Sequence, residues 1–545
     1  MKTYSLSGNI VNIFAKKIFS GTITVADGVI IDVEESPDID YDTFIVPGFV
    51  DAHVHIESSM LTPSEFARLA VVHGTVAAVA DPHEIANVLG IEGVRYMVAD
   101  GETVPFNFFF GASSCVPATP FETAGGTITA DDMETLLRDD KLRFVGEMMN
   151  FPGVLQGLPD VMDKIAVAKK YGVPIDGHAP GLRGEDAKRY IAAGITTDHE
   201  CVSYEEAAEK ILYGMKIAIR EGSAAKDYDA LHGLLKKFPG DVMFCSDDKH
   251  PDDLVKGHIN DMVKCSASLG YDVFDVLRCA CVTPVEHYGL PVGLLRKGDA
   301  ADFIVVDNLE DFSVLQTYIK GVLVADKGAT LIESQPSERV NAFNATEKCV
   351  DDFKVAAEGT TIRVIEATDG SLITGEGHYD ANIVEGNVVS DVEHDILKIA
   401  VVNRYNDKPP AVAFIKGFGL QSGAMASSVA HDSHNIVAVG TSDEELCAAI
   451  NAVISSEGGI AVADGEDIDI LPLPVAGIMS DGDGYAVAKK YSELDAKAKS
   501  LGSSMTAPFM TLSFMALLVI PELKLSDNGL FDGTKFKFTK LFIAG

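Results

Sequence analysis

Eight short apolar runs, each ending in polar residues, alternate with helical stretches over roughly the first half of the chain. The runs lie at residues 44–52, 75–80, 106–111, 143–146, 173–177, 196–198, 215–220 and 242–246. Strands that alternate with helices form parallel sheets, and eight such units match a (β/α)₈ barrel of about 250 residues. A doubly wound open sheet is the alternative, but no G-x-G-x-x-G turn follows the first run. The sequence therefore predicts an α/β fold with a TIM-type barrel over residues 46–290.

Short strands are predicted on both sides of this block. The pair Asp27-Gly28 separates two alternating runs near the N-terminus and is a strong hairpin signal. Similar runs recur at residues 302–307 and 320–325, so we expect one small β-domain made of residues 1–45 plus 291–335. Residues 350–545 mix strands with helices, one of which begins with a capping-box sequence at 442–445 (SDEE). This region predicts a separate C-terminal α+β domain.

Composition excludes several classes of partner. The 545 residues include 44 basic and 81 acidic side chains, a net charge of −37 that would repel nucleic acid. Eight scattered cysteines without a C-x-x-C pair indicate free thiols in a reducing compartment. The N-terminus has no signal-peptide core, and no apolar run is long enough to span a bilayer. We expect a cytoplasmic protein with no membrane contact.

Histidines and carboxylates at the ends of five runs form a full ligand set for two metal ions. The first run contains H-x-H, and because strand side chains alternate with period two, both imidazoles face the same way. Imidazoles and carboxylates bind divalent ions, and a bridging carboxylate can hold two ions about 3.5–4 Å apart. The expected metal ligands are His53, His55, Glu147, His178, His199 and Asp247, with Glu147 as the bridge.

This ligand set indicates hydrolysis. A divalent ion lowers the pKa of its bound water from about 15.7 towards about 7 and so supplies hydroxide near neutral pH. Asp247 is the expected proton shuttle to a leaving nitrogen, and Glu147 is the second catalytic group. Asp248 is the rival, but the period-two rule lets only one of the pair face the site. The pattern fits hydrolysis of an amide, a cyclic amide or an amidine-like carbon that bears an amino group.

Longer motifs resemble a known family. Residues 47–55 (PGFVDAHVH) resemble the first-strand signature of the amidohydrolase superfamily. Several motifs are similar to those of the adenine deaminases within it: 55–60 (HIESSM), 81–88 (DPHEIANV), 246–248 (SDD), 416–420 (KGFGL), 426–435 (ASSVAHDSHN), 471–477 (LPLPVAG) and, more loosely, 507–511 (APFMT). The resemblance implies hydrolytic deamination of free adenine to hypoxanthine and ammonia. It also implies a manganese- or iron-loaded site and a homo-oligomer such as a dimer. Glu147 departs from the carboxylated lysine of many superfamily members.

Other polar residues near the strand ends are candidates for contacts with a purine base. We expect this role for His83, Glu84, Arg220 and Ser223. Two roles stay open for Asp81. It is either part of the site or the N-cap of a helix whose first residue is Pro82.

A polar loop in the C-terminal domain is expected to cover the barrel mouth as a lid, through His431 and His434. A turn that only hydrogen-bonds itself is the alternative for this loop. Two other functions stay open: a cyclic-amide hydrolase with the same ligands, and a catalytically silent barrel scaffold. Because a scaffold would be expected to lose ligands, the complete set favours an enzyme.

Overall fold

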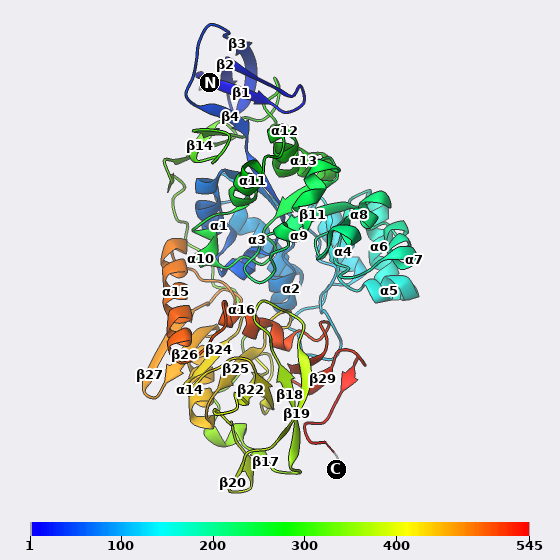
Figure 1. Ribbon diagram of the computed structural model, residues 1–545, viewed down its shortest axis with the longest axis vertical. Helices are drawn as coiled ribbons and strands as arrows, with labels where there is room; N and C mark the ends of the chain where they lie inside the picture. The colour runs from blue at the N-terminus through cyan, green and yellow to red at the C-terminus, as the bar shows by residue number, and fades with distance from the viewer. Residues whose placement is uncertain (1–2, 544–545) are drawn as a thin grey trace.

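The structure is a computed structural model that describes residues 3–543 and places them in three parts along its long axis (Figure 1). A β-sheet with the N-terminal strands lies at one end, the strand–helix region is in the middle, and the C-terminal half forms the other end. Within residues 3–543 no helix is long and apolar enough to cross a membrane. The eight cysteines are all free thiols, as predicted.

The first part is a single eight-stranded sheet to which both flanks of the central region contribute, in the order β16-β15-β14-β13-β4-β1-β2-β3. The two flanks meet where β13 pairs antiparallel with β4. Asp27 and Gly28, both with positive φ (50° and 82°), make the two-residue turn between β2 and β3 that the sequence predicts. The strands are β1 (Thr3–Asn12), β2 (Lys17–Ala26), β3 (Val29–Glu35), β4 (Phe44–Pro47), β13 (Phe303–Val306), β14 (Val314–Ile319), β15 (Val322–Asp326) and β16 (Ala329–Thr330).

The middle part contains eight strands, all paired in parallel, at the positions of the eight apolar runs. They are β5 (Phe49–Val54), β6 (Thr75–Ala80), β7 (Asn107–Phe110), β8 (Val145–Met148), β9 (Ile175–Gly177), β10 (Thr197–Asp198), β11 (Lys216–Arg220) and β12 (Val242–Cys245). Ladders join β5-β6-β7, β8-β9 and β10-β11-β12. Parallel bridges Ala112–Val145 and Val54–Asp247 link these groups, the second between the first and last strands. A hydrogen bond from Thr196 N to Ile175 O, 2.8 Å long, connects β9 with β10.

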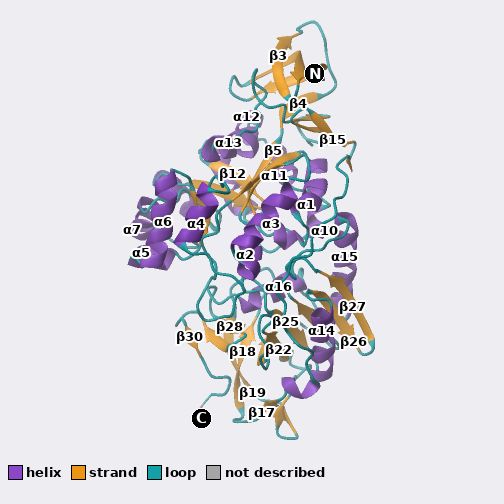
Figure 2. Cartoon of the chain, turned by 180° about the vertical axis from the view of Figure 1, so that it is seen from behind, coloured by secondary structure: helices purple, strands orange, loops and turns teal. Residues whose placement is uncertain are grey.

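Helices follow every one of these strands and lie outside them (Figure 2). Strands β5 and β6 are buried at every position, because the helices cover one face and the other strands cover the opposite face. The helices are α1 (Pro63–Ala70), α2 (His83–Leu89), α3 (Ile91–Gly101), α4 (Ala130–Arg138), α5 (Phe151–Gln156), α6 (Pro159–Tyr171), α7 (Gly184–Ala192), α8 (Tyr204–Leu212), α9 (Tyr228–Leu231), α10 (Pro251–Leu254), α11 (Ile259–Ser268), α12 (Val273–Leu277) and α13 (Thr283–Tyr288).

The C-terminal part is built on a second eight-stranded sheet, ordered β19-β18-β23-β22-β25-β24-β26-β27. Its strands are β18 (Thr361–Glu366), β19 (Gly375–Asp380), β22 (Leu397–Val402), β23 (Ala411–Lys416), β24 (Ala424–Ser427), β25 (Ile436–Gly440), β26 (Gly459–Asp464) and β27 (Asp467–Pro472). Helices α14 (Asp443–Ser455), α15 (Gly484–Ser500) and α16 (Pro508–Ser513) pack around it, and the short strands are β17 (Val355–Ala356), β20 (Ile383–Val384), β21 (Asn387–Val388), β28 (Leu523–Ser526), β29 (Gly529–Asp532) and β30 (Lys537–Phe538).

Alternate residues of this sheet face two different cores. In β22, Ala400 and Val402 pack in the core beneath α14, whereas Ile399 and Val401 belong to the large core that also contains the central strands. The C-terminal half and the central region therefore share one continuous apolar core. Ser442 caps α14, because its side chain accepts a hydrogen bond from Glu445 N. The second bond of the predicted capping box, from Ser442 N to the Glu445 carboxylate, is replaced by a bond from Gly465 N to that carboxylate.

Candidate metal and active site

Six predicted ligands lie together at the carboxyl ends of five central strands. His53 and His55 come from the end of β5 and Glu147 from β8. His178 and His199 directly follow β9 and β10, and Asp247 comes two residues after the end of β12. Five of the six are buried, and His178, whose side chain is 17% exposed, marks the side of the cluster nearest to solvent. Parallel strands bring their carboxyl ends to one edge, which is why residues up to 194 positions apart meet here.

Two imidazoles and a carboxylate face one another at the first and last strands. The Nε2 atoms of His53 and His55 are 3.2 Å apart. Asp247 Oδ1 lies 3.7 Å from the first of these nitrogens and 3.3 Å from the second. Three donor atoms converging on one point is an arrangement that a divalent ion can occupy.

Glu147 lies between this group and the other two histidines. Its Oε2 is 2.9 Å from His178 Nδ1 and 3.1 Å from His199 Nε2, while its Oε1 is 3.7 Å from His55 Nε2. Burial opposes ionisation of Glu147, but His178 and His199 outweigh it and hold its pKa well below the usual value. A carboxylate with one oxygen towards each histidine group has the geometry expected of a bridge.

Asp247 has a backbone conformation that points its side chain into the cluster. Its φ of 52° is in the left-handed region, which costs energy for a residue other than glycine. Hydrogen bonds with β5 hold it there: Asp247 N donates to His53 O at 3.0 Å, and His55 N donates to Asp247 O at 3.3 Å. Burial opposes its ionisation, but His55, His199 and Arg220 keep its pKa well below the usual value. Asp248 instead accepts a hydrogen bond from Ser58 Oγ at 2.5 Å.

Asp81 supports Glu147 and does not cap a helix. Its Oδ2 accepts from Glu147 N at 2.8 Å, and its Oδ1 accepts from Ser113 Oγ at 3.0 Å. Helix α2 begins at His83 with Pro82 as its N-cap and no side-chain capping bond, so the alternative N-cap prediction is wrong. The carboxylate fits against the strand because residue 146 is glycine: a Cβ there would lie 2.3 Å from Asp81 Oδ2.

Of the predicted substrate contacts, His83 and Glu84 lie beside the cluster. His83 Nδ1 is 3.5 Å from Glu147 Oε1, and His83 Nε2 is 3.4 Å from Glu84 Oε1. Ser223 is partly exposed, and its Oγ donates to Asp253 at 2.7 Å and accepts from His250 N at 2.9 Å.

Arg220 is surrounded by three carboxylates. Its Nη1 donates to Asp247 Oδ2 at 3.0 Å, its Nε donates to Asp227 Oδ2 at 2.7 Å, and its Nη2 donates to Glu200 Oε2 at 2.9 Å. The guanidinium thereby fixes the carboxylate of Asp247 from behind.

The C-terminal half contributes side chains that lie beside the cluster of predicted ligands. In the loop 428–435 between β24 and β25, His431 Nδ1 makes a short contact with Glu84 Oε1, and His434 Nε2 lies 2.6 Å from Glu84 Oε2. All three side chains are buried. The loop therefore contacts the central region and is not a turn that only hydrogen-bonds itself.

Sequence reasoning missed three buried carboxylates. Glu200 Oε1 lies 3.5 Å from both His178 Nδ1 and His199 Nε2. Asp432 has a carboxylate oxygen within 4.8 Å of donor atoms of His83 and Glu84. Glu57 Oε1 accepts from Ile85 N at 3.1 Å. Glu200 directly follows a predicted ligand at a strand end and was findable from that position. Asp432 and Glu57 lie within the motifs at 426–435 and 55–60, whose resemblance could have marked them.

The donor set fits divalent metal ions. Overlapping groups of three donors, each with all ligand atoms within 4.8 Å of one another, include His53-His55-Asp247, His53-Glu147-His199 and His178-His199-Glu200. All donors in these groups are nitrogen or oxygen, and most are buried, which suits borderline to hard divalent ions more than thiolate-seeking metals. His53 Nδ1 lies 3.7 Å from Asp176 Oδ2, which is too far for a hydrogen bond, and neither atom has a hydrogen-bond partner among residues 3–543.

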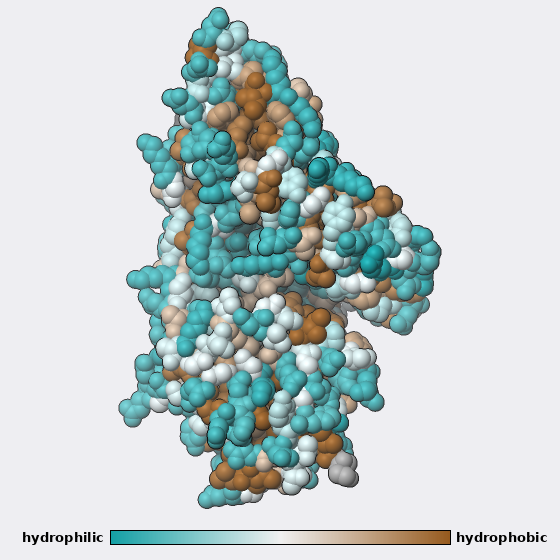
Figure 3. All heavy atoms as spheres, viewed as in Figure 1, coloured by the Kyte–Doolittle hydropathy of each residue, from teal (hydrophilic) through white to brown (hydrophobic). Residues whose placement is uncertain are grey.

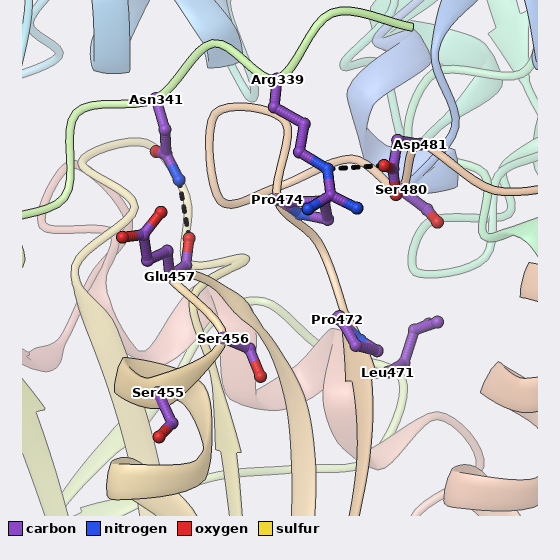
Figure 4. Close-up of a pocket in the computed structure, with 10 residues that line it drawn as sticks. All are labelled: Arg339, Asn341, Ser455, Ser456, Glu457, Leu471, Pro472, Pro474, Ser480 and Asp481. Atoms are coloured by element: carbon purple, nitrogen blue, oxygen red, sulfur yellow. Dashed lines mark hydrogen bonds and ion pairs between the residues drawn. The ribbon is translucent and has the colours of Figure 1, made fainter. Parts of the chain in front are cut away.

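A cavity elsewhere in the molecule contains none of these residues. It has a volume of about 540 Å³ and lies between residues 339–341, the end of α14 and the end of β27 (Figure 4). Arg339 pairs with Asp481 at 2.7 Å across its wall, and Asn341 Nδ2 donates to Glu457 O at 2.7 Å. Its lining contains no histidine or cysteine, so the chemistry belongs to the buried cluster.

Two known families match this chain. The amidohydrolase family matches residues 44–324, and the adenine deaminase C-terminal domain matches residues 371–537. An adenine deaminase of Salinibacter ruber is 56% identical over 543 residues, which cover 99% of each chain. Adenine deaminases of Methanosarcina mazei and Borreliella burgdorferi are 52% and 44% identical, over 99% of this chain and 100% of each relative.

The α/β fold, the buried histidines and carboxylates at the strand ends and the match over residues 44–324 define a hydrolase of the amidohydrolase class, with a cluster that is consistent with metal binding. Since full-length relatives share about half of all positions with it, this chain belongs to the adenine deaminase family.

Proposed function

We propose that this chain hydrolyses the 6-amino group of free adenine and releases hypoxanthine and ammonia. The observation that carries the proposal is the position of Glu147, whose two carboxylate oxygens face two histidine groups in a chain 56% identical to an adenine deaminase. The six ligands His53, His55, Glu147, His178, His199 and Asp247 would hold two divalent ions, manganese or iron. The catalytically silent scaffold is disfavoured because none of these ligands is lacking.

The contacts suggest a role for each of these residues in the proposed reaction. Divalent ions bound by the six ligands would activate a water for attack on C6. Asp247 is placed to accept the proton of the attacking water and to pass it to the departing amino nitrogen, so that adenine and water become hypoxanthine and ammonia. Arg220 and the left-handed backbone of Asp247 orient this carboxylate, so Arg220 is a positioning residue in addition to any contact with the base. His83 and Glu84 contribute to the wall beside the base, and Ser223 remains a predicted contact.

We further propose that the eight central strands close into a barrel over residues 46–290. The bridges Val54–Asp247 and Ala112–Val145 and the bond between Thr196 and Ile175 support closure, because each connects strands of different ladders. We propose two further domains beside the barrel. They are a small β-domain of residues 1–45 plus 291–335 and an α+β domain of residues 350–545. Assembly into dimers stays a prediction that light scattering can test.

An ammonia-release assay tests the proposed function. The purified full-length protein, loaded with Mn²⁺, is incubated with adenine, adenosine, guanine and cytosine, and ring opening is followed with dihydroorotate. Deamination of adenine with hardly any turnover of adenosine is expected. Ring opening of dihydroorotate without ammonia from adenine would favour the cyclic-amide hydrolase, and ammonia from adenosine alone would contradict the assignment.

A further inference from the structure

Several buried polar atoms where the C-terminal loop meets the central strands have no hydrogen-bond partner among residues 3–543. They are Nε2 of His431, Oδ2 of Asp432, Oε2 of Glu57 and Oε2 of Glu122. Buried polar groups in proteins are nearly always hydrogen-bonded, and an exception at a functional site needs an explanation. These atoms come from both halves of the chain, and each is an unpaired group with which a polar ligand would form a hydrogen bond.

Asp432 has the position within this set that best suits contact with a bound base. One of its carboxylate oxygens is within 4.8 Å of donor atoms of His83 and Glu84, and His83 Nδ1 is 3.5 Å from Glu147. Asp432 is thus separated from Glu147 by one side chain, on the side of the C-terminal loop. Glu57 and Glu122 each use one oxygen within the protein, accepting from Ile85 N and from Thr119 Oγ1, both at 3.1 Å.

The chemistry of adenine supplies the donor that Asp432 lacks. C6 of the purine must lie beside Glu147 and Asp247, so N9 of the imidazole ring, on the far side of the base from C6, points away from that pair. Apart from the amino group that leaves, the only N–H of free adenine is on this imidazole ring. A nucleoside has its sugar on that nitrogen and therefore offers no N–H there.

We infer that Asp432 accepts a hydrogen bond from the imidazole N–H of the base and so selects free adenine over adenine substituted at that nitrogen. The inference rests on the proposed function, and it names the residue that would restrict the enzyme to free adenine. A site built to bond an N–H rejects analogues that lack it, because the buried acceptor is then left unpaired.

The test compares adenine with 9-methyladenine in the full-length, metal-loaded enzyme. In Asp432→Ala, the ratio of kcat/KM for adenine to that for 9-methyladenine should fall at least about tenfold, mainly through a higher KM for adenine. Where 9-methyladenine is turned over too slowly, inhibition constants of hypoxanthine and 9-methylhypoxanthine against adenine give the same ratio. Glu493→Ala, at an exposed carboxylate of α15, should leave the ratio unchanged.

Other outcomes would overturn the inference. Equal losses for both compounds would mean a structural role for Asp432, and loss of bound metal in Asp432→Ala would make it a ligand. A change of the ratio in Glu122→Gln but not in Asp432→Ala would mean that Glu122, and not Asp432, contacts the base. Absence of adenine turnover in the wild-type protein would contradict the proposed function itself, which separates the two failures.

Discussion

Glu84 and His434 are 350 positions apart in the chain, yet Oε2 of the first lies 2.6 Å from Nε2 of the second. Glu84 lies in the first turn of helix α2 in the central region, and His434 belongs to a loop of the C-terminal sheet. His431 contacts the other oxygen of the same carboxylate, and its ring stacks on Phe514 with centroids 4.5 Å apart. The C-terminal half therefore forms one wall of the candidate active site.

The first prediction concerns this wall. His434→Ala or His431→Ala should lower adenine turnover at least about tenfold, because Glu84 loses a partner that fixes its side chain beside His83. Metal content and melting temperature should change little, since Glu84 keeps its other histidine. His394→Ala, at an exposed histidine of the same half, is the matched control. Full activity in a soluble fragment ending near residue 333 would contradict a catalytic contribution of the C-terminal half.

The second prediction concerns the metal ligands. His55→Ala or His199→Ala should remove one of two metal equivalents and most activity, because each deletes a donor from a group of three. Elemental analysis of the purified variants gives the metal content. His378→Ala, whose side chain is 53% exposed, should retain both equivalents. Undiminished metal in both ligand variants would mean that the assignment is wrong.

The third prediction distinguishes two neighbouring aspartates. Asp247→Asn should fold but turn over adenine at least about 10²-fold more slowly, since an amide cannot carry the proton. Asp248→Asn should be milder, because Asp248 bonds to Ser58 and not to the histidines. Steady-state kinetics of the two variants measure the ranking, and the reverse order would identify Asp248 as the proton carrier.

The fourth prediction uses the contact between Gly146 and Asp81. Gly146→Ala should reduce metal binding and activity, because its Cβ would lie 2.3 Å from the carboxylate that holds Glu147 N. Gly233→Ala is the control, since its Cβ would meet only ordinary contacts at 3.5 Å. Metal titration of both proteins provides the comparison, and equal affinities would show that the strand can shift without cost.

The fifth prediction concerns a buried lysine of the C-terminal half. Lys524 is fully buried, and its Nζ donates to Leu372 O at 2.8 Å and to Phe514 O at 3.1 Å. Burial lowers its pKa to about 7 from 10.5. Between these two values the unfolded chain binds the proton and the folded chain does not, so this group makes stability rise with pH. The contribution is complete above the unfolded pKa and is lost as pH falls towards 7.

Lys524→Met should therefore flatten the pH dependence of the melting temperature above about pH 7, where the titration of Lys524 contributes. Lys489→Met replaces a lysine whose side chain is 81% exposed and should keep the wild-type slope. Identical slopes in wild type and Lys524→Met would mean that Lys524 stays charged in the folded protein.

The sequence by itself determined the strand positions and the residues that are predicted as metal ligands. Strand β6 has the predicted bounds of 75–80, and the turn at Asp27-Gly28 forms as expected, because both signals are local: apolar patterning and a glycine that tolerates positive φ. The six predicted ligands meet because each lies in or within two residues of the carboxyl end of an apolar strand, and parallel strands end at one edge. Local patterning was enough to select the residues, although their roles remain predictions.

Only the tertiary structure decided which side chains surround these ligands. The sequence around Asp81 suggested a helix cap, yet its carboxylate binds Glu147 N across 66 positions. Arg220 was expected at the substrate and is held by three carboxylates from separate segments. Asp432 meets His83 and Glu84 because the C-terminal sheet shares a core with the central strands. Such contacts depend on how distant segments pack, and no periodicity within a short window encodes that packing.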